Sequence, residues 1–298
     1  MRLAVVQFVG EADPRLVLHD SRGLLPLELP ANLRTALENH CPDAIRRAAE
    51  SGMRPPLPIE SVQRWLPPVI DPRTFRDFYA FEQHVKTCRA NRGLAMVPEW
   101  YKAPVFYFSN PTTLRGHNEP VCRPRSTRAL DFELEVAAVI GQAVENAEGA
   151  EAESAIFGFT VLNDLSARDL QAEEMKCGLG PAKGKDFATV IGPGLVTIDE
   201  LVKRRIAPGR YDLAMCARKN GREISRGNMR DMYFDFTQLI CHASRDAALF
   251  PGDLIGSGTV GTGCILELRP ENTSGWLEPG DVIELEIEHI GVLRTPII

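Results

Sequence analysis

Two glutamates, Glu133 and Glu135, are separated by one residue and precede an apolar run from Val136 to Gly141. Side chains alternate between the faces of a strand, so both carboxylates would point the same way, with their backbones about 6.6 Å apart. The run that follows shows no polar alternation, which is typical of a strand covered on both faces. Burying two carboxylates without a cation would raise at least one pKa. The pair therefore suggests a site for a hard cation such as Mg²⁺, Ca²⁺ or Mn²⁺.

An ordinary acidic strand has the same spacing. Glutamates alternate with apolar residues in Ile283–Glu288, where we expect a half-exposed strand with a solvated acidic face. Spacing alone leaves this alternative open for Glu133 and Glu135, so a cation site needs a third carboxylate. Asp164, at the end of an apolar strand, is a candidate, although Asp164 or Ser166 also suits the N-cap of a following helix.

A histidine and a lysine have side chains that suit proton transfer and anion binding. His84 lies three residues after Phe81 and four before Cys88, so the three share a helix face. On that face His84 is either a general base or a hydrogen-bonded packing residue. Lys185, within Lys183–Phe187, either brings an ammonium group to an anionic substrate or belongs to a solvated turn.

Composition limits the class of protein. The 298 residues are 44% hydrophobic and 25% charged, as in an ordinary globular protein. The net charge of −6 argues against nucleic acid or an anionic membrane as a partner. No apolar stretch approaches the roughly 18 residues of a membrane span, and the N-terminus is too strand-like for a signal peptide. Seven scattered cysteines without a C-x-x-C motif indicate reduced thiols and a cytoplasmic protein.

The pattern along the chain predicts two units. Residues 1–66 form a small N-terminal α+β domain with a proline-rich linker, and residues 67–298 form the second domain. In the first unit we expect strands at 3–8 and 15–19 and a helix at 30–52. In the second, a helix from Asp77 to Gly93, with Asp77 as its N-cap, is followed mainly by strands. There is no regular βαβ alternation, so a doubly wound sheet is not expected.

One motif that often marks a nucleotide site lacks its context. Gly256–Gly261 matches G-x-G-x-x-G, but we expect the strand Cys264–Leu268 to follow it, where a dinucleotide site needs a helix.

Taken together, the ordered blocks of the chain resemble the fumarylacetoacetate hydrolase superfamily. The resemblance covers about Pro67 to Ile290, and it rests on the joint order of the blocks Arg76–Tyr79, Gln83–His84, Leu130–Glu135, Asn163–Gln171, Lys185–Phe187, Ile191–Pro193, Pro251–Asp253, Gly256–Thr259, Leu266–Leu268 and Leu277–Asp281. It implies a strand-rich α+β fold, a mixed β-sandwich-like roll with flanking helices, and a homodimer.

The resemblance also implies roles for individual residues. The metal ligands would be carboxylates, and a divalent ion would bind there, with Mg²⁺ as first choice and Mn²⁺ or Ca²⁺ as alternatives. The implied ligands are Asp77, Glu133, Glu135 and Asp164. His84 would be the general base, Glu267 would orient it, and Lys185 and Gln171 would lie around the developing oxyanion. The remaining substrate contacts would be Tyr79, Arg92, Tyr107 and Thr259.

The function expected by resemblance is hydrolysis of a carbon–carbon bond in a β-diketo acid, acylpyruvate-like or fumarylacetoacetate-like. Water activated by His84 would attack a carbonyl carbon, and cleavage would leave an enolate on the metal. Thr87 stands where shorter relatives carry the Glu of a His-x-x-Glu pair, which favours the partnership of His84 with Glu267. Met175 replaces a tyrosine of fumarylacetoacetase. Two alternatives stay open: decarboxylation, isomerisation or hydration of a 2-oxo acid, and a β-rich protein that binds a metal without catalysis.

Overall fold

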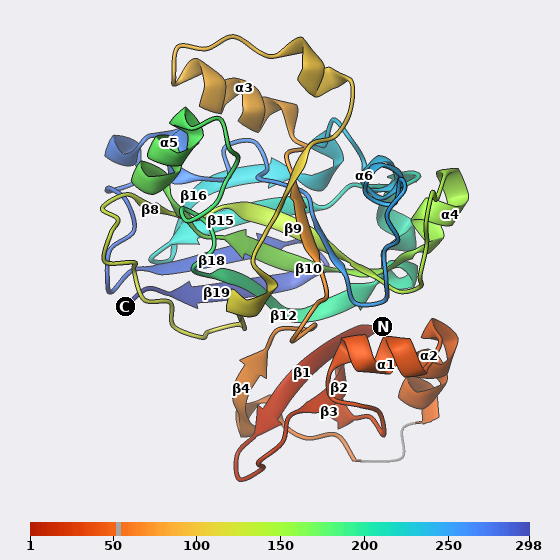
Figure 1. Ribbon diagram of the computed structural model, residues 1–298. Helices are drawn as coiled ribbons and strands as arrows, with labels where there is room; N and C mark the ends of the chain where they lie inside the picture. The colour runs from red at the N-terminus through yellow and green to blue at the C-terminus, as the bar shows by residue number, and fades with distance from the viewer. Residues whose placement is uncertain (52–54) are drawn as a thin grey trace.

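The computed structural model describes residues 1–51 and 55–298, and its core is one large mixed sheet (Figure 1). The strand order in this sheet is β3-β2-β1-β12-β10-β9-β17-β5-β6, with β4 paired to β1 and β7 to β12. A second, antiparallel sheet has the order β16-β15-β18-β19. The strand-rich α+β fold expected from the sequence is therefore confirmed.

The N-terminal unit lies at one end of the molecule (Figure 1). Its elements are β1 (Arg2–Phe8), β2 (Arg15–Asp20), β3 (Gly23–Pro26), α1 (Leu33–Asn39), α2 (Pro42–Ser51) and β4 (Val62–Leu66). Both predicted strands are confirmed. Strand β1 also joins the main sheet, because Arg2 and Leu3 pair with Val196 and Leu195 of β12. The domain boundary at residue 66 stays a prediction.

The single helix predicted over residues 30–52 is wrong. The structure has two helices, which are separated at His40 and Cys41. Pro42 explains the break: its ring blocks a helical turn before it, and proline is well placed at the first position of a new helix. The predicted end at Gly52 lies outside the described residues.

Three long strands form the centre of the main sheet: β9 (Leu134–Ile140), β10 (Ile156–Asp164) and β12 (Thr189–Thr197). Every residue of β9 is buried. Val136, Ala138 and Ile140 join the core of the second unit, whereas Ala137 and Val139 join a core shared with the N-terminal unit. Apolar cover on both faces explains why the sequence of β9 does not alternate.

The expected acidic strand near the C-terminus is confirmed. It is β18 (Val282–Ile287), in which buried apolar residues alternate with partly exposed ones. Glu286 forms a 2.7 Å ion pair with Arg218 on the neighbouring strand β15. The same spacing of glutamates thus gives a half-exposed strand here and a buried one in β9.

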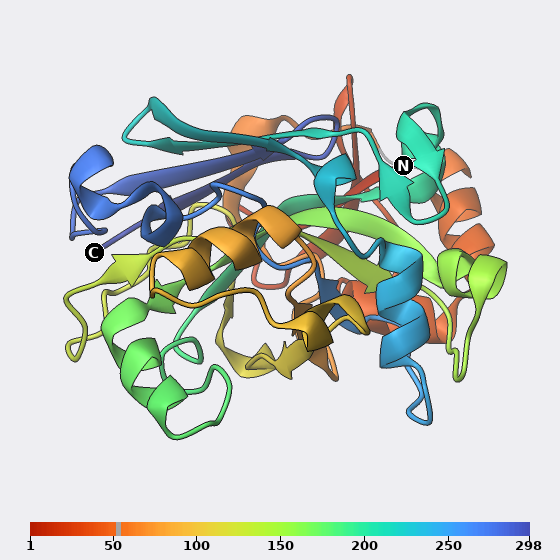
Figure 2. The same ribbon diagram turned by 90° about the horizontal axis from the view of Figure 1, so that it is seen from above.

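The helix predicted from Asp77 to Gly93 begins later. Asp77 belongs to the strand β5 (Phe75–Phe78), and α3 extends over Glu82–Ala90 with Phe81 at its N-cap. Asp77 is therefore not a helix cap. Its strand pairs in parallel with β17 (Leu254–Gly256), which is distant in sequence. Helix α3 lies across the second unit, on the side away from the N-terminal unit (Figures 1 and 2).

The remaining elements connect these layers. The other strands are β6 (Phe106–Phe108), β7 (Leu114–Arg115), β8 (Leu130–Asp131), β11 (Ser166–Ala167), β13 (Arg205–Ala207), β14 (Arg210–Tyr211), β15 (Ala214–Lys219), β16 (Arg222–Asn228) and β19 (Gly291–Pro296). The other α-helices are α4 (Gly149–Ser154), α5 (Arg168–Lys176), α6 (Phe236–Ala243) and α7 (Ile265–Leu268). The 3₁₀ helices are Ile59–Ser61, Pro98–Tyr101, Pro111–Thr113, Ile198–Arg204, Met229–Asp231 and Pro270–Asn272.

The strand predicted at Cys264–Leu268 is wrong, because these residues form the one-turn helix α7. A distant carboxylate explains its stability: Asp131 accepts hydrogen bonds from the backbone N–H of Ile265 (2.7 Å) and of Leu266 (3.0 Å). A helix does follow the glycine-rich segment, but two of its first N–H groups are bonded to a protein carboxylate. These groups do not face a phosphate.

Replacing Asp131 by alanine should destabilise the protein. The change removes the acceptor for the backbone N–H groups of α7 and leaves the buried Arg168, which Asp131 contacts at 2.8 Å, short of one partner. Breaking a buried ion pair typically costs about 3–5 kcal/mol. We expect a loss of this size in the free energy of unfolding, measured by urea denaturation. Glu173→Ala is the control, since Glu173 pairs with Lys176 at the surface. Equal losses for the two variants would contradict the assignment.

Candidate active site

Three buried carboxylates come together at one end of the strands in the main sheet. Asp77 lies on β5, Glu135 on β9, and Asp164 at the end of β10. One oxygen atom from each lies within 4.8 Å of the others. The three residues are 2%, 1% and 0% exposed. The third carboxylate that a cation site requires is therefore present, and the helix-cap alternative for Asp164 is wrong, since its side chain points into this cluster.

The electrostatics of this cluster favour a cation. Burial, followed by repulsion from Asp164, raises the pKa of Asp77 well above its ordinary value. Burial and then repulsion from Asp77 do the same to the pKa of Glu135. Among the described residues, the buried Oε2 atom of Glu135 has no hydrogen-bond partner. An all-oxygen donor set with an unpaired carboxylate oxygen fits a hard divalent ion.

The glycine-rich segment after β17 makes room for this cluster. A side chain at Gly256 would place its Cβ 2.3 Å from Oδ1 of Asp77. Gly258 has a φ of +76°, and a Cβ there would lie 2.4 Å from the carbonyl oxygen of Phe78. Its backbone N–H donates to Oδ1 of Asp77 at 3.2 Å. The glycines that resemble a nucleotide motif thus allow their own backbone to lie close to β5, which leaves space for the side chain of Asp77.

Two of the predicted substrate contacts bind the carboxylates directly. The hydroxyl of Tyr107 donates to Oδ2 of Asp164 at 2.6 Å. The hydroxyl of Thr259 donates to Oε1 of Glu135 at 3.2 Å. Both residues therefore line the cluster, and their roles toward a substrate stay predictions.

Glu133 lies beside the cluster with both carboxylate oxygens occupied. It sits between β8 and β9, accepts a 2.7 Å hydrogen bond from Arg168 at Oε1, and accepts another from Lys185 at Oε2. Lys185 also donates to Asp164. Burial opposes the charge of Glu133, but Lys185 and Arg168 outweigh it and hold its pKa well below the usual range. Glu133 is thus ionised, and its role as a metal ligand stays a prediction.

Arg168 is the site residue that sequence reasoning missed. It is buried, and besides Glu133 it contacts Asp131 at 2.8 Å and the side-chain oxygen of Gln171 at 3.0 Å. It therefore orients Gln171, one of the predicted oxyanion residues. A signal was present in the sequence, because several carboxylates buried together require a cationic partner.

His84 and Glu267 meet as the resemblance implied. Nδ1 of His84, on α3, lies 2.5 Å from Oε1 of Glu267, on α7, and both residues are buried. Burial opposes a charged ring, but Glu267 outweighs it and raises the pKa of His84 to about 10. The ring of Tyr79 packs edge-on against His84, with centroids 5.3 Å apart. A hydrogen-bonded packing residue would form the same contact, so the role of His84 as a base stays a prediction.

Arg92 lies farther from the carboxylates. Its Nε donates to the backbone oxygen of Cys88 at 3.0 Å, and its Nη1 lies 3.5 Å from the sulfur of Met175 on α5. Arg92 thus bridges the end of α3 to α5. Its role toward a substrate carboxylate stays a prediction.

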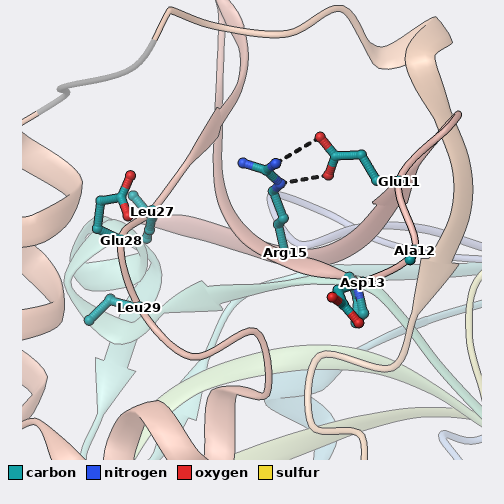
Figure 3. A pocket seen from close by; sticks show the side chains of 8 residues that line it. Glu11, Ala12, Asp13, Arg15, Leu27, Glu28 and Leu29 are labelled. Atoms are coloured by element: carbon teal, nitrogen blue, oxygen red, sulfur yellow. Dashed lines mark hydrogen bonds and ion pairs between the residues drawn. The ribbon is translucent and has the colours of Figure 1, made fainter.

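An open hollow elsewhere on the molecule is separate from these groups. It lies on the N-terminal unit, where Arg15 forms a 2.6 Å ion pair with Glu11 (Figure 3). Its lining residues are Glu11, Ala12, Asp13, Pro14, Arg15, Leu27, Glu28 and Leu29. All of them precede the second unit, so this hollow has no part in the candidate site.

No helix among residues 1–51 and 55–298 is long and apolar enough to cross a membrane.

Comparisons with known proteins show which family this chain resembles. The fumarylacetoacetase of Arabidopsis thaliana is 31% identical over 283 residues, which cover 76% of this chain and 66% of the plant protein. A probable 2-hydroxyhepta-2,4-diene-1,7-dioate isomerase from Mycobacterium abscessus has a similar structure, with a TM-score of 0.75, 26% identity and coverage of 100% of this chain and 98% of that one.

A third protein shows the same fold at lower identity. Fumarylpyruvate hydrolase from Pseudomonas aeruginosa, whose structure is a complex with Mn²⁺ and pyruvate, has a TM-score of 0.61 and 21% identity, and the match covers 79% of this chain and 92% of that one.

The sequence profile of the fumarylacetoacetate (FAA) hydrolase C-terminal family matches residues 73–298. The protein therefore belongs to the fumarylacetoacetate hydrolase family.

Proposed function

We propose that this protein is a metal-dependent hydrolase that cleaves a carbon–carbon bond of a β-diketo acid, such as an acylpyruvate or a fumarylacetoacetate-like compound. One observation carries the proposal: a histidine–carboxylate pair adjoins a buried carboxylate cluster. After Lys185 and Arg168, a charged His84 also lowers the pKa of Glu133, which lies beside the cluster. The family contains both hydrolases and isomerases, and the paired His84 favours hydrolysis.

The proposed metal site consists of Asp77, Glu135 and Asp164, with Glu133 beside them. We propose Mg²⁺ as the ion, with Mn²⁺ or Ca²⁺ as alternatives, because the donors are all carboxylate oxygens. A bound divalent ion would act as a Lewis acid toward a carbonyl oxygen, and its charge would favour the neutral form of His84.

His84 is the residue that would transfer protons in the proposed reaction. Glu267 holds Nδ1, which fixes the ring orientation and leaves Nε2 to exchange a proton with water. A pKa of about 10 means that both ring nitrogens are protonated, and the ring positively charged, at neutral pH in the site without a metal. The ring must release one proton before it can act as a base.

The groups that would stabilise a developing oxyanion are Lys185 and Gln171, positioned by their carboxylate and arginine partners. Lys185 is held between Glu133 and Asp164, and Gln171 is held by Arg168. Loss of one such donor typically lowers kcat by about 10²–10³. Lys185 is fixed at two points, so it is preorganised and does not have to be recruited during the reaction.

Isomerisation is the second candidate, and the similarity to a probable dioate isomerase favours it. The same residues would then move a proton between carbon and oxygen without attack by water. Decarboxylation of a 2-oxo acid is the remaining enzymatic alternative. Membership of a family of enzymes argues against the alternative in which the metal site has no catalytic role.

We also propose that the protein is a cytoplasmic homodimer that acts on a small dicarboxylic or diketo acid and binds neither nucleic acid nor membranes. A second copy would cover apolar side chains near the edge strand β6, where Phe108 is 65% exposed. The net charge of −6 supports the absence of polyanionic partners.

Turnover of a small substrate panel tests the proposed reaction. We expect acetylpyruvate, fumarylpyruvate or fumarylacetoacetate to be cleaved into two acids in the presence of Mg²⁺ and to be left intact with EDTA. Turnover is measured as the loss of diketone absorbance. His84→Ala and Glu267→Gln should each lower kcat by about 10²–10⁴. Lys86→Ala, on the exposed face of the same helix, is the control.

Two results would contradict this proposal. An unchanged kcat in His84→Ala would remove the histidine from the reaction. Release of CO₂ from oxaloacetate alone, or a product that keeps every carbon of the substrate, would move the protein to one of the alternative reactions.

Replacing Glu135 by glutamine should weaken metal binding. The change removes one carboxylate of the cluster, and we expect the dissociation constant for Mn²⁺ to rise by about 100-fold or more. Even mutation of residues that only hydrogen-bond to metal ligands lowers metal affinity by about 10–100-fold. Free Mn²⁺ is measured by electron paramagnetic resonance. Glu133→Gln, measured in parallel, tests whether Glu133 is also a ligand. Glu284→Gln, on the half-exposed β18, is the control. Equal affinities of Glu135→Gln and wild type would place the metal elsewhere.

A further inference from the structure

A second group of potential metal ligands adjoins the histidine pair. His84, Cys88 and Cys264 each offer one ligand atom, and these three atoms lie within 4.8 Å of one another. All three residues are buried. Cys88 lies one turn after His84 on α3, and Cys264 directly precedes α7, which carries Glu267. The proposed reaction uses neither thiol.

Several separations between these atoms are close to those between the ligands of a tetrahedral metal ion. The sulfur of Cys88 lies 3.7 Å from each ring nitrogen of His84, and the sulfur of Cys264 lies 3.7 Å from Oε1 of Glu267. With typical Zn–N and Zn–S bond lengths, neighbouring ligand atoms in a tetrahedron are about 3.5–3.8 Å apart. To admit an ion, the 2.5 Å contact between Nδ1 of His84 and Glu267 must open, and the ring must turn until one nitrogen faces the sulfur of Cys88, which now lies equally far from both.

The two groups of ligands differ in chemical character. The cluster of Asp77, Glu135 and Asp164 offers only oxygen, which suits Mg²⁺ or Mn²⁺. Two sulfurs and an imidazole nitrogen select a softer ion such as Zn²⁺. The second group would therefore select a different metal from the first.

We propose that His84, Cys88 and Cys264, with Glu267 as fourth ligand, form a binding site for Zn²⁺ or another thiophilic divalent ion, and that occupation of this site inhibits the enzyme. A ring nitrogen that coordinates an ion cannot exchange a proton with water, and Glu267 no longer orients the ring. The inhibition rests on the proposed role of His84 as the base. The binding site itself does not.

Co²⁺ is the probe for the site, because thiolate ligation gives it a charge-transfer band that carboxylates do not. Reduced protein, with the carboxylate cluster saturated by excess Mg²⁺, is titrated with Co²⁺ under a reductant that does not bind metals. We expect a thiolate-to-cobalt band in the near ultraviolet that saturates at one ion per chain and disappears when Zn²⁺ is added.

Variants assign the band to its ligands. Cys88→Ser and Cys264→Ser are nearly isosteric and should each abolish it, whereas Cys177→Ser, at an exposed thiol, should retain it. Circular dichroism checks that each variant is folded. The titration of wild-type protein tests the site even if a variant does not fold. Absence of the band in wild-type protein with free thiols, or its persistence in both buried-thiol variants, would overturn the site.

A separate measurement tests inhibition. With excess Mg²⁺, Zn²⁺ should inhibit wild-type turnover, and each buried-thiol variant should require at least about tenfold more Zn²⁺, with every rate normalised to that variant without Zn²⁺. A cobalt band without inhibition by Zn²⁺ would overturn the regulatory part of the proposal. If this protein turns over none of the diketo acids, the proposed function is refuted. The cobalt titration still decides whether the metal site exists.

Discussion

The structure depends on how a group of buried carboxylates is neutralised. Five of them, Asp77, Asp131, Glu133, Glu135 and Asp164, lie in one region of the second unit. Among the described residues, the lysine and arginine side chains that bond to this group are Arg168, which binds Asp131 and Glu133, and Lys185, which binds Glu133 and Asp164. In the described part of the chain, neither Asp77 nor Glu135 has such a bond, and burial, together with repulsion from neighbouring carboxylates, raises the pKa of each. The proposed affinity for a cation would thus arise from a charge imbalance that folding leaves in place.

The fold brings these groups together from separate parts of the chain. Asp77 reaches the cluster because β5 pairs in parallel with β17, and Glu135 and Asp164 come from the adjacent strands β9 and β10. Asp131 connects this end of the sheet to the histidine pair, because it binds both Arg168 and the start of α7. The orientation of Glu267 and the charge state of Glu133 therefore share one structural support.

The sequence predicted much of this, but unevenly. The absence of alternation in β9 correctly indicated burial, because it reflects local composition alone. Pro42 was a local signal for the break between α1 and α2 that the helical periodicity outweighed. The assignments of Asp77 as a helix cap and of Cys264–Leu268 as a strand failed because pairing with β17 and hydrogen bonds from Asp131 decide them, and both partners are more than a hundred residues away. The pairing of His84 with Glu267 was available only from the family resemblance, and Arg168 gave no periodic signal.

The division of the histidine pair between two helices ties its chemistry to the position of α3. His84 is on α3 and Glu267 is on α7, so the 2.5 Å contact exists only while the two helices touch. Any displacement that lifts α3 to admit an acid into this closed region also removes the carboxylate that stabilises a protonated ring. The ring would then be neutral while the two helices are apart and would be protonated again once Glu267 returns, so the charge of His84 depends on the position of α3.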